Sequence, residues 1–457
     1  MFTHQKQFDP LTEQRIIVLC DDASHPHVNA VAGALGDTIE ELVTAPFNRH
    51  RTFGKLKAKE VVFIRLSDLA KPKQRMEAAK GVAGLTSDAI IALDTFPPER
   101  IAEWMETLVR ASYRFDKFKT DDEEHTTNFF YAATTEVTEQ VHEGIVIGEA
   151  ANHTRDLVNT PYNYLNATDL AQYATALEAI DNVKVSVLDK PACEALNMGA
   201  FLGVNRGSID EPTLIHVEYT GDPGSKDITA LVGKGVMYDT GGYSLKTVQG
   251  MPSMKMDMGG AATVLGAIEA IARLKAKANV SVVIAATDNR IGDHATVPDD
   301  ILTSAKGLTI EIISTDAEGR LTLADALWFA QEKGATRLID VATLTGAVVG
   351  ALGKTYTGAF SNDDAFTKDV LNAAKNAGEN VWRMPIHEEY HDALKSEVAD
   401  MKNSGGRLAG ASVAAAFLEK FVDDARPWVH LDIAGTAYGE KEGATGTLVK
   451  TLTKLFV

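Results

Sequence analysis

A chain of 457 residues is too long for one compact core, so we expect two domains. The net charge of −18, from 63 acidic and 45 basic residues, makes nucleic-acid binding a poor first hypothesis. No apolar run approaches the ~20 residues of a membrane-spanning helix, and Met1–Leu11 lacks the apolar core of a secretory signal. The two cysteines, Cys20 and Cys193, lie in apolar contexts, and we expect a cytoplasmic protein in which both are reduced and buried.

The first part of the chain has the pattern of a small α/β domain. Three short apolar segments are typical of buried strands: Ile16–Cys20, Val61–Ile64 and Ala89–Leu93. The polar stretch Lys117–Thr127 marks the start of a linker, and a long helix is expected over Val137–Leu157. We therefore predict an N-terminal domain over residues 1–135 and a catalytic domain over 136–457, which begins with a linking helix over 136–158.

The second part alternates strands and helices more clearly. Its expected strands are near-continuous apolar runs: Ile228–Met237, Val280–Thr287, Leu338–Thr343 and Val429–Ala434. Its expected helices are Ala261–Leu274 and Leu321–Glu332. Apolar strands separated by helices indicate an α/β domain with a mostly parallel central sheet flanked by helices. In such sheets ligands bind at the carboxyl ends of the strands, so the functional site is expected there.

Polar residues follow the expected strand and loop ends in four stretches: Lys234–Lys246, Met254–Gly260, Thr287–Asn289 and Ser314–Arg320. The first is rich in glycine, but Lys234 lacks the glycine spacing and the following Ser or Thr of a phosphate-binding loop. In the second, Asp257 stands just before an expected helix, where an N-cap role is the simpler interpretation. No single stretch of this kind identifies a site.

The fourth stretch carries the strongest signal, because Asp316, Glu318 and Arg320 alternate along it. If the segment is extended, all three side chains point the same way. Two carboxylates side by side are costly unless a cation bridges them, although a surface loop with a salt bridge would also account for the pattern. With Asp239 and Asp257 they form an oxygen-rich set that suits Mg²⁺ or Mn²⁺, and Zn²⁺ also accepts carboxylates. Two metals roughly 3.5–4 Å apart could share such a set and activate a water molecule.

These motifs resemble those of the leucyl aminopeptidase (cytosol aminopeptidase) family, a family of di-metal enzymes. The matching stretches include Gly233-Lys-Gly, Asp239-Thr-Gly-Gly, Asp257-Met-Gly-Gly-Ala-Ala, Thr315-Asp-Ala-Glu-Gly-Arg320, Asp340-Val-Ala-Thr-Leu-Thr-Gly346 and His430-Leu-Asp-Ile-Ala-Gly435. The resemblance covers roughly residues 150–457 and hardly touches the first part of the chain. It implies a macro-domain-like N-terminal domain and a hydrolase that releases N-terminal residues, with leucine-like residues preferred, from peptides.

The resemblance also implies two divalent metal ions per subunit, Mn²⁺ or Zn²⁺, with Mg²⁺ or Co²⁺ as alternatives. One metal would be held by Lys234, Asp239, Asp257 and Glu318. The other would be held by Asp239, Asp316 and Glu318. A lysine can bind a metal only as the neutral amine, so the pKa of Lys234 would have to lie far below its usual value.

Further roles follow from the same resemblance. Lys246 would stay charged and stabilise the oxyanion that forms from the scissile carbonyl. Arg320 would hold a bicarbonate ion that relays a proton, together with Gly319 and the backbone around Leu344. The pocket for the first side chain would be lined by Met254, Thr343, Gly346 and Ala434. The resemblance further implies a homohexamer that acts on peptides with a free N-terminus, without a membrane partner.

Three alternatives stand beside this interpretation. A DNA-binding regulator of the same family is disfavoured by the net charge of −18. A metal-dependent phosphatase would use a similar set of acids. The segment His387–His391 matches the H-E-x-x-H pattern of zinc proteases, in which both histidines share one face of a helix. We favour an exposed amphipathic helix there, because no third histidine follows at the spacing of that class.

Overall fold

The protein divides into two compact units in the computed structural model. The structure describes residues 2–120, 127–133, 137–423 and 426–457. The units are Met1–Glu149 and Ala150–Val457, and the division between them falls within helix α5 (Thr138–Asn159). The boundary predicted at residue 135 precedes that helix. Most of the predicted linker Lys117–Thr127 lies outside the described residues.

The first unit is built on a six-stranded sheet with the order β1-β6-β5-β2-β4-β3. Its strands are β1 (Phe2–Gln5), β2 (Ile16–Cys20), β3 (Phe47–Arg51), β4 (Glu60–Ile64), β5 (Ala89–Ala92) and β6 (Phe129–Ala132). Every neighbouring pair is parallel except β3 with β4. The three strands predicted in this unit are confirmed as β2, β4 and β5, because short apolar runs of this length are buried on both faces of a parallel sheet.

Helices cover both faces of this sheet. Successive side chains of β2 point to opposite faces, and all of them are buried, so each face must be covered. Its helices are α1 (Pro26–Leu35), α2 (Ile39–Leu42), α3 (Pro72–Ala83) and α4 (Pro98–Ala111). Ile16 and Val18 belong to the core cluster that includes residues of α3 and α4. Ile17 and Leu19 belong to the opposite cluster, with residues of α1 and α2. Each face of the sheet therefore has its own apolar core.

The second unit is built on an eight-stranded sheet with the order β15-β14-β17-β13-β9-β10-β8-β7. Its strands are β7 (Val183–Leu188), β8 (Thr213–Thr220), β9 (Ile228–Asp239), β10 (Asn279–Asn289), β13 (Arg337–Ala342), β14 (Thr357–Ser361), β15 (Val381–Arg383) and β17 (Trp428–Asp432). The central strands β17, β13, β9 and β10 are parallel to one another, whereas β14 and β8 run antiparallel to their inner neighbours. The predicted mostly parallel sheet is therefore confirmed, and its four predicted strands are the four at its centre.

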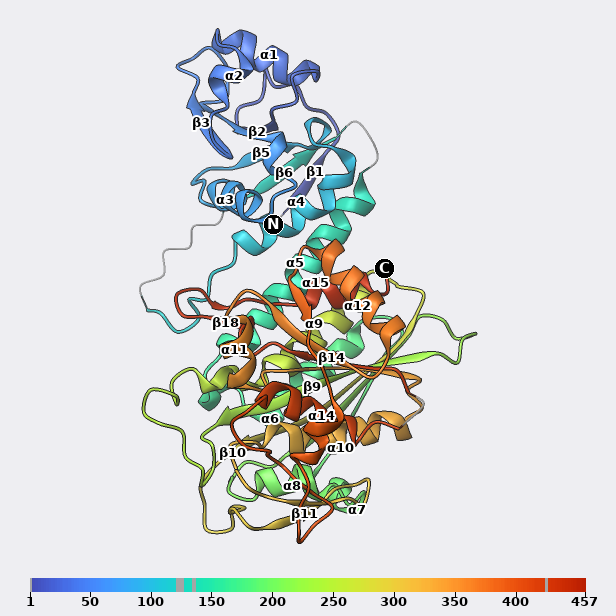
Figure 1. The fold of residues 1–457 in the computed structure, drawn as a ribbon. Coiled ribbons are helices and arrows are strands. Elements are labelled where there is room, and N and C mark those ends of the chain that lie inside the picture. The colour runs from blue at the N-terminus through green and yellow to red at the C-terminus, as the bar shows by residue number, and fades with distance from the viewer. Residues whose placement is uncertain (1, 121–126, 134–136, 424–425) are drawn as a thin grey trace. The chain divides into compact units, whose positions relative to one another are not determined.

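Helices cover both faces of the larger sheet as well. One apolar core includes α6 (Ala167–Ala176), α9 (Gly259–Arg273), α12 (Asp364–Ala377) and α15 (Val449–Lys454). The other includes α8 (Gly199–Asn205), α10 (Gly319–Glu332) and α14 (Gly410–Glu419). Figure 1 shows α9, α12 and α15 on one side of the strands and α8, α10 and α14 on the other. The shorter elements include α7 (Lys190–Ala195), α11 (Gly346–Leu352), α13 (Glu388–Asp392), β11 (Ile301–Thr303), β12 (Thr309–Glu311), β16 (Met401–Lys402), β18 (Tyr438–Gly439) and β19 (Gly443–Ala444).

Two expectations from composition can be checked against the fold. Cys20 and Cys193 are both free and buried, so the expected reduced pair is confirmed. Among the described residues, no helix combines the length and the apolarity that crossing a membrane requires.

A buried network of polar side chains joins the central strands β13 and β17. Asp340 on β13 lies directly opposite His430 on β17. The Asp340 carboxylate contacts Nδ1 of His430 at 2.6 Å and accepts a hydrogen bond from Nε1 of Trp428 at 2.6 Å. Asp340 and His430 are both fully buried. Burial lowers the pKa of His430, but the charge of Asp340 outweighs that effect and raises it above the ordinary value.

We expect Asp340→Ala to destabilise the protein by about 3–5 kcal/mol, because it leaves a buried imidazole and a buried indole N–H without their partner. A group whose pKa is raised by folding contributes stability that is complete below its unfolded pKa and is lost as the pH rises through the folded value. The cost should therefore be largest below about pH 6.5 and smaller in alkaline solution. Urea unfolding of both proteins at acid and alkaline pH measures it, and an equal cost at both would contradict the ion pair.

Candidate metal centre

The polar residues of the second unit gather where its central parallel strands end. Asp239 is the last residue of β9, and Asn289 is the last residue of β10. Thr343 follows the last residue of β13, the other neighbour of β9. Because these three strands are parallel, their carboxyl ends meet at one edge of the sheet. The predicted position of the site therefore matches the position of these residues.

Three carboxylates form the centre of this cluster. Oxygens of Asp239, Asp316 and Glu318 all lie within 4.8 Å of one another, and they are the one group of potential metal ligands of this kind found among the described residues. The Asp239 and Glu318 residues are only 2% and 3% exposed, while the Asp316 side chain is 38% exposed. The cluster thus has two buried acids and one that reaches solvent.

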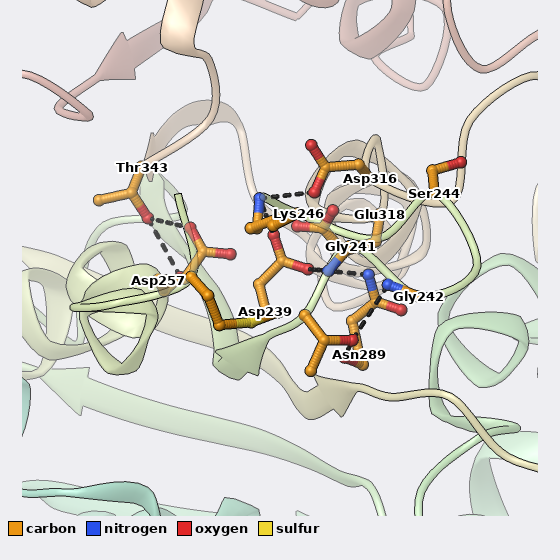
Figure 2. Close-up of polar contacts among 12 residues, drawn as sticks. Asp239, Gly241, Gly242, Ser244, Lys246, Asp257, Asn289, Asp316, Glu318 and Thr343 are labelled. Carbon is orange, nitrogen blue, oxygen red and sulfur yellow. Dashed lines mark hydrogen bonds and ion pairs between the residues drawn. The ribbon is translucent and has the colours of Figure 1, made fainter. Parts of the chain in front are cut away.

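Lys234 and Asp257 complete the buried side of the cluster. The Lys234 Nζ lies 2.7 Å from Asp257 Oδ2 and 3.0 Å from Glu318 Oε1. It also donates a hydrogen bond of 3.0 Å to the carbonyl oxygen of Thr343. Thr343 in turn donates from its hydroxyl to Asp257 Oδ1 at 2.8 Å, which fixes the orientation of that carboxylate. Figure 2 shows Thr343 and Asp257 facing each other on one side of the cluster.

Lys246 lies on the more open side of the cluster. Its Nζ is 2.7 Å from Asp239 Oδ2 and 2.5 Å from Asp316 Oδ1, so it bridges these two acids (Figure 2). Its side chain is 17% exposed, against 3% for Lys234. The two lysines therefore differ in access to solvent, although both contact the same set of acids.

Burial and the neighbouring charges shift the pKa values of the whole cluster. Burial and the charge of Glu318 raise the pKa of Asp239 to about 6, and burial raises the pKa of Asp257 well above its ordinary value. Burial alone would lower the pKa of Lys234, but Asp257 and Glu318 outweigh it and raise that pKa. Burial would also lower the pKa of Lys246, but the charges of Asp239 and Glu318 outweigh burial and raise that pKa.

The donor set fits a divalent cation. Glu318 Oε2 is buried without a hydrogen-bond partner among the described residues, which is costly for a charged oxygen. The raised pKa values of Asp239 and Asp257 show that the two lysines do not fully compensate these acids. Oxygens from four acids and one amine nitrogen are ligands that Mn²⁺ and Zn²⁺ both accept.

Arg320 lies in the first turn of α10, next to the acids in sequence but engaged elsewhere. It donates from Nη1 to the carbonyl oxygen of Asn403 at 2.7 Å, and its Nε has no partner among the described residues. Burial lowers the pKa of Arg320 to about 10, although Glu318 and Asp432 oppose that effect. Described contacts thus leave this buried guanidinium only partly satisfied.

The structure corrects the local geometry predicted for two of the motifs. The segment around Asp316 is not extended, because Asp316 lies in a turn and Glu318 is the N-cap of α10 with helical φ and ψ. The turn brings the Asp316 and Glu318 carboxylates together, and the alternation of side chains along an extended strand plays no part. The N-cap alternative considered for Asp257 does not hold, because Asp257 lies inside a 3₁₀ turn, η5 (Met254–Met258), and its side chain contacts Lys234.

Three residues that no prediction assigned hold the cluster in place. Asn289 donates from Nδ2 to Asp239 Oδ1 at 2.8 Å and to the Thr315 carbonyl at 2.9 Å. Asn403 donates to the carbonyl of Ser314 at 2.7 Å, and Asp432 accepts from the backbone N–H of Leu344 at 3.1 Å. The position of Asn289 at a strand end was a usable signal, and Asp432 lies within His430–Gly435, one of the motifs that carry the resemblance. Nothing in the sequence pointed to Asn403.

Glycines allow the backbone to approach this site closely. Gly241 has φ +84° and donates its N–H to Asp239 Oδ1 at 2.8 Å. A Cβ on Gly241 would lie 2.5 Å from the carbonyl oxygen of Ser244. A Cβ on Gly319 would lie 2.4 Å from Cε and 2.6 Å from Nζ of Lys234. Gly319 therefore packs against the side chain of Lys234, a predicted metal ligand. The role predicted for Gly319 was different, namely to help Arg320 hold an anion.

We expect Gly319→Ala to displace Lys234 from Asp257 and Glu318, because the new methyl carbon would lie only 2.4 Å from Cε and 2.6 Å from Nζ of Lys234. Lys234 is buried and cannot move freely, so affinity for metal should fall by at least about tenfold, as for other disturbed ligand environments. Metal titration followed by calorimetry measures this change. Gly350→Ala is the control, because a Cβ at Gly350 would meet no atom within 4 Å. Gly334→Ala would not serve, because the φ of +89° at Gly334 strains any residue with a side chain. Equal affinity in Gly319→Ala and Gly350→Ala would contradict the predicted contact.

The residues predicted to line the substrate pocket lie around the same edge of the sheet. Met254 begins η5, Gly346 begins α11, and Ala434 follows β17. Gly346 is exposed and Met254 and Ala434 are partly exposed, while Thr343 is buried against Asp257. The N–H of Leu344, predicted to assist anion binding, is donated to Asp432 in this structure.

The H-E-x-x-H segment does not form a zinc site in the structure. Helix α13 spans only Glu388–Asp392, so His387 is its N-cap and the two histidines do not share a helical face. His387 Nδ1 accepts from the N–H of Glu389, and His391 Nε2 lies 2.8 Å from Glu419 Oε2. The segment is a short surface helix, shorter than the amphipathic helix we expected.

A mostly parallel α/β sheet with clustered acids and two lysines at its carboxyl edge is thus a candidate binding site for divalent cations. Residues 152–453 match the family model described as the cytosol aminopeptidase family, catalytic domain. The match spans well over half of the chain, and the chain belongs to this family. The resemblance seen in the motifs is therefore confirmed.

Named relatives and solved structures agree with this assignment. The chain is 45% identical over 381 residues to a probable cytosol aminopeptidase of Bacillus subtilis, covering 80% of this chain and 76% of that protein. It is 48% identical over 367 residues to one of Treponema denticola, covering 78% and 76%. A mutant of tomato leucine aminopeptidase superposes with a TM-score of 0.86 at 29% identity, covering 100% of this chain and 96% of that one. The bottromycin maturation enzyme BotP gives 0.84 at 29% identity, covering 97% and 98%.

The protein is thus a metal-dependent aminopeptidase with a two-domain α/β fold. The predicted fold class and enzyme class are confirmed. None of these similarities supports the alternatives of a DNA-binding regulator or a metal-dependent phosphatase.

Proposed function

We propose that the enzyme binds two divalent cations that share Asp239 and Glu318. Lys234 and Asp257 would complete the first site, and Asp316 would complete the second. The observation that carries this proposal is the convergence of three carboxylates within 4.8 Å, with Glu318 Oε2 lacking a partner among the described residues. Two such cations would supply Lewis acidity for the substrate amide and lower the pKa of the attacking water.

The proposal requires Lys234 to lose its proton when the first cation binds. Without a cation, Asp257 and Glu318 raise the pKa of Lys234, the opposite of the direction that a metal ligand needs. A divalent cation between the same acids would replace the ammonium as their counter-charge and lower that pKa. Metal binding should therefore release a proton from Lys234 and strengthen as the pH rises.

We assign the remaining charges to the reaction. Lys246 is more exposed than Lys234 and stays protonated, so its ammonium would donate a hydrogen bond to the oxygen of the scissile carbonyl as negative charge develops there. Arg320 would hold a bicarbonate ion near Gly319 and the backbone at Leu344, and its partnerless Nε supports an anion there. The Leu344 N–H would take part only after leaving Asp432.

The substrates would be peptides with a free N-terminus, because an unblocked amine can bind beside the acids. Met254, Thr343, Gly346 and Ala434 would line the pocket of the first residue. A thioether and methyl groups favour an apolar side chain such as leucine. The name of the tomato enzyme supports the same preference.

The assembly and setting are proposals of the same kind. We infer that the enzyme works in the cytoplasm, in line with the names of the cytosol aminopeptidase relatives. The homohexamer implied by the motif resemblance stays a proposal. The metals would be Mn²⁺ or Zn²⁺, with Mg²⁺ or Co²⁺ as alternatives, because mixed amine and carboxylate sites accept several of these ions. Metal analysis and size-exclusion chromatography with light scattering test these points directly.

A metal-dependent activity screen tests the proposed function. Enzyme stripped with a chelator would be reloaded with Mn²⁺, Zn²⁺, Mg²⁺ or Co²⁺ and assayed on aminoacyl amides with varied first residues. We expect activity to return with metal, saturate at two ions per chain and favour leucine over charged residues. N-acetylated substrates should remain intact. Full activity at one ion per chain, or cleavage of the blocked substrates, would refute the two-metal aminopeptidase site.

A further inference from the structure

A second candidate site lies in the first unit, where basic residues surround a cleft of about 1000 Å³. This volume is at the upper end of the range for small-molecule sites. The cleft opens where β2, β4 and β5 begin and β3 ends, at the amino edge of the parallel sheet. It is lined in part by Arg15, Arg49, Arg51, Phe53, Lys57 and Lys59.

The charge of this cleft is opposite to that of the chain. Residues 49–59 contain five basic residues, Arg49, Arg51, Lys55, Lys57 and Lys59, and no acidic residue, whereas the whole chain has a net charge of −18. A chain with a negative net charge therefore contains a basic segment over residues 49–59. Such a concentration of one sign of charge attracts anions to the surface that carries it.

The two acids that line the cleft offset only part of its positive charge. Glu60 accepts hydrogen bonds from Arg49 at 2.5 and 3.0 Å, whereas Asp88 accepts from the neutral N–H and side-chain amide of Asn128 and keeps its charge in the cleft. Arg51, Lys57 and Lys59 form no ion pair with any described residue. Five basic residues against two acids leave the cleft with a positive charge, and three of its exposed cations form no ion pair within the described chain.

An aromatic ring stands beside these cations. Phe53 is 86% exposed, and its φ of +51° lies in the left-handed region that non-glycine residues rarely adopt. The loop that carries it is closed by Thr52, which donates from its N–H to the Lys59 carbonyl at 3.0 Å and from its hydroxyl to the Ala58 carbonyl at 2.6 Å. Folding therefore holds an apolar ring in solvent at the rim of a basic cleft.

We propose that this cleft binds a nucleoside polyphosphate, with the phosphates against Arg51, Lys57 and Lys59 and the base stacked on Phe53. Cations that lack counter-charges suit phosphate oxygens, and a planar base stacks on an exposed aromatic ring. One aromatic ring and three such cations in a single cleft match one nucleotide, whereas a strand of nucleic acid needs a groove that stacks successive bases. The described residues that line the cleft all belong to the first unit, whereas the residues of the metal centre belong to the second.

Calorimetric titration of the full-length, metal-loaded enzyme with ATP at physiological salt tests the proposal. We expect saturable binding with a Kd below about 1 mM. Arg51→Glu combined with Lys57→Glu should weaken it by at least about tenfold, and Phe53→Ala by about fivefold or more, the effect of losing one stacked base. Lys73→Glu is the control for a charge reversal outside the cleft, since Lys73 is an exposed basic residue on α3. It should bind ATP like the parent enzyme, and circular dichroism would show that each variant is folded.

Titrations with tripolyphosphate and with a single-stranded oligonucleotide test whether the cleft prefers a nucleotide, a simple anion or nucleic acid. Tripolyphosphate should bind at least about fivefold more weakly than ATP, because it lacks the base. Equal binding of the two, together with no effect of Phe53→Ala, would overturn the nucleotide proposal in favour of a simple anion site. A single-stranded oligonucleotide that bound more than about tenfold tighter than ATP would overturn it in favour of nucleic acid. No binding of ATP, or binding that the charge reversals leave unchanged, would also overturn it.

Discussion

Glu318→Ala is expected to abolish both metal binding and hydrolysis of aminoacyl amides. Glu318 contacts Lys234, its carboxylate lies within 4.8 Å of those of Asp239 and Asp316, and it is one of the two acids that both proposed cations would share. Losing a shared ligand would disrupt both sites, so kcat/KM should fall by at least about 10³-fold, which corresponds to about 4 kcal/mol of transition-state stabilisation. Metal content measured by plasma emission after gel filtration should fall from two ions per chain to fewer than one.

The control for this variant lies on the same helix. Glu332 is the last residue of α10 and is exposed, so Glu332→Ala removes a carboxylate from the same element without touching the cluster. It should keep both metals and full activity. Because Lys234 retains its contact with Asp257 in the Glu318→Ala protein, that variant should stay folded. Two bound metals in a folded Glu318→Ala enzyme would show that the proposed ligand set is wrong.

Lys246→Ala should separate chemistry from metal binding. In the structure Lys246 neutralises Asp239 and Asp316, a role that bound cations would take over. The variant should therefore keep its metals but lose the hydrogen bond to the developing oxyanion. Removing one such donor typically lowers kcat by about 10²–10³-fold, and KM should change much less.

Steady-state kinetics and metal analysis on the same samples measure this effect. Lys246→Arg keeps the charge with a different geometry, so it should recover part of the lost kcat. Lys277→Ala, at an exposed position in the same unit, should behave like the parent enzyme. If Lys246→Ala lost its metals as completely as Glu318→Ala, Lys246 would be a structural part of the metal site and not a group that acts on the substrate.

The two expected results rest on different kinds of prediction. The acids were found from the sequence, because each follows an apolar strand or begins a helix in a pattern that is readable along the chain. The difference between the two lysines was not readable in that way. Lys234 lies within β9 and Lys246 follows that strand in the same glycine-rich stretch, and only the resemblance to the family gave them different roles. In the fold the Lys234 side chain is 3% exposed and that of Lys246 is 17% exposed.

The local geometry of the site was the least predictable part. Asp316 and Glu318 were expected to share a face of an extended segment, but a turn followed by the start of α10 brings them together. Taken alone, the stretch around Asp257 favoured a helix cap, but its carboxylate contacts Lys234 and Thr343 within the cluster. In both cases contacts with residues far away in the sequence outweigh the local preference of the segment.

By itself the sequence determined the two-domain α/β fold, the central parallel strands and the family to which the chain belongs. These follow from apolar runs, their spacing and ordered motifs, which are local properties that the chain carries before it folds. Only the tertiary structure decided which polar groups support the acids, such as Asn289, Asn403 and Asp432. It also showed that five basic residues of an acidic chain surround one cleft. Such arrangements depend on long-range packing, and no pattern along the chain encodes the distances between residues that the fold brings together.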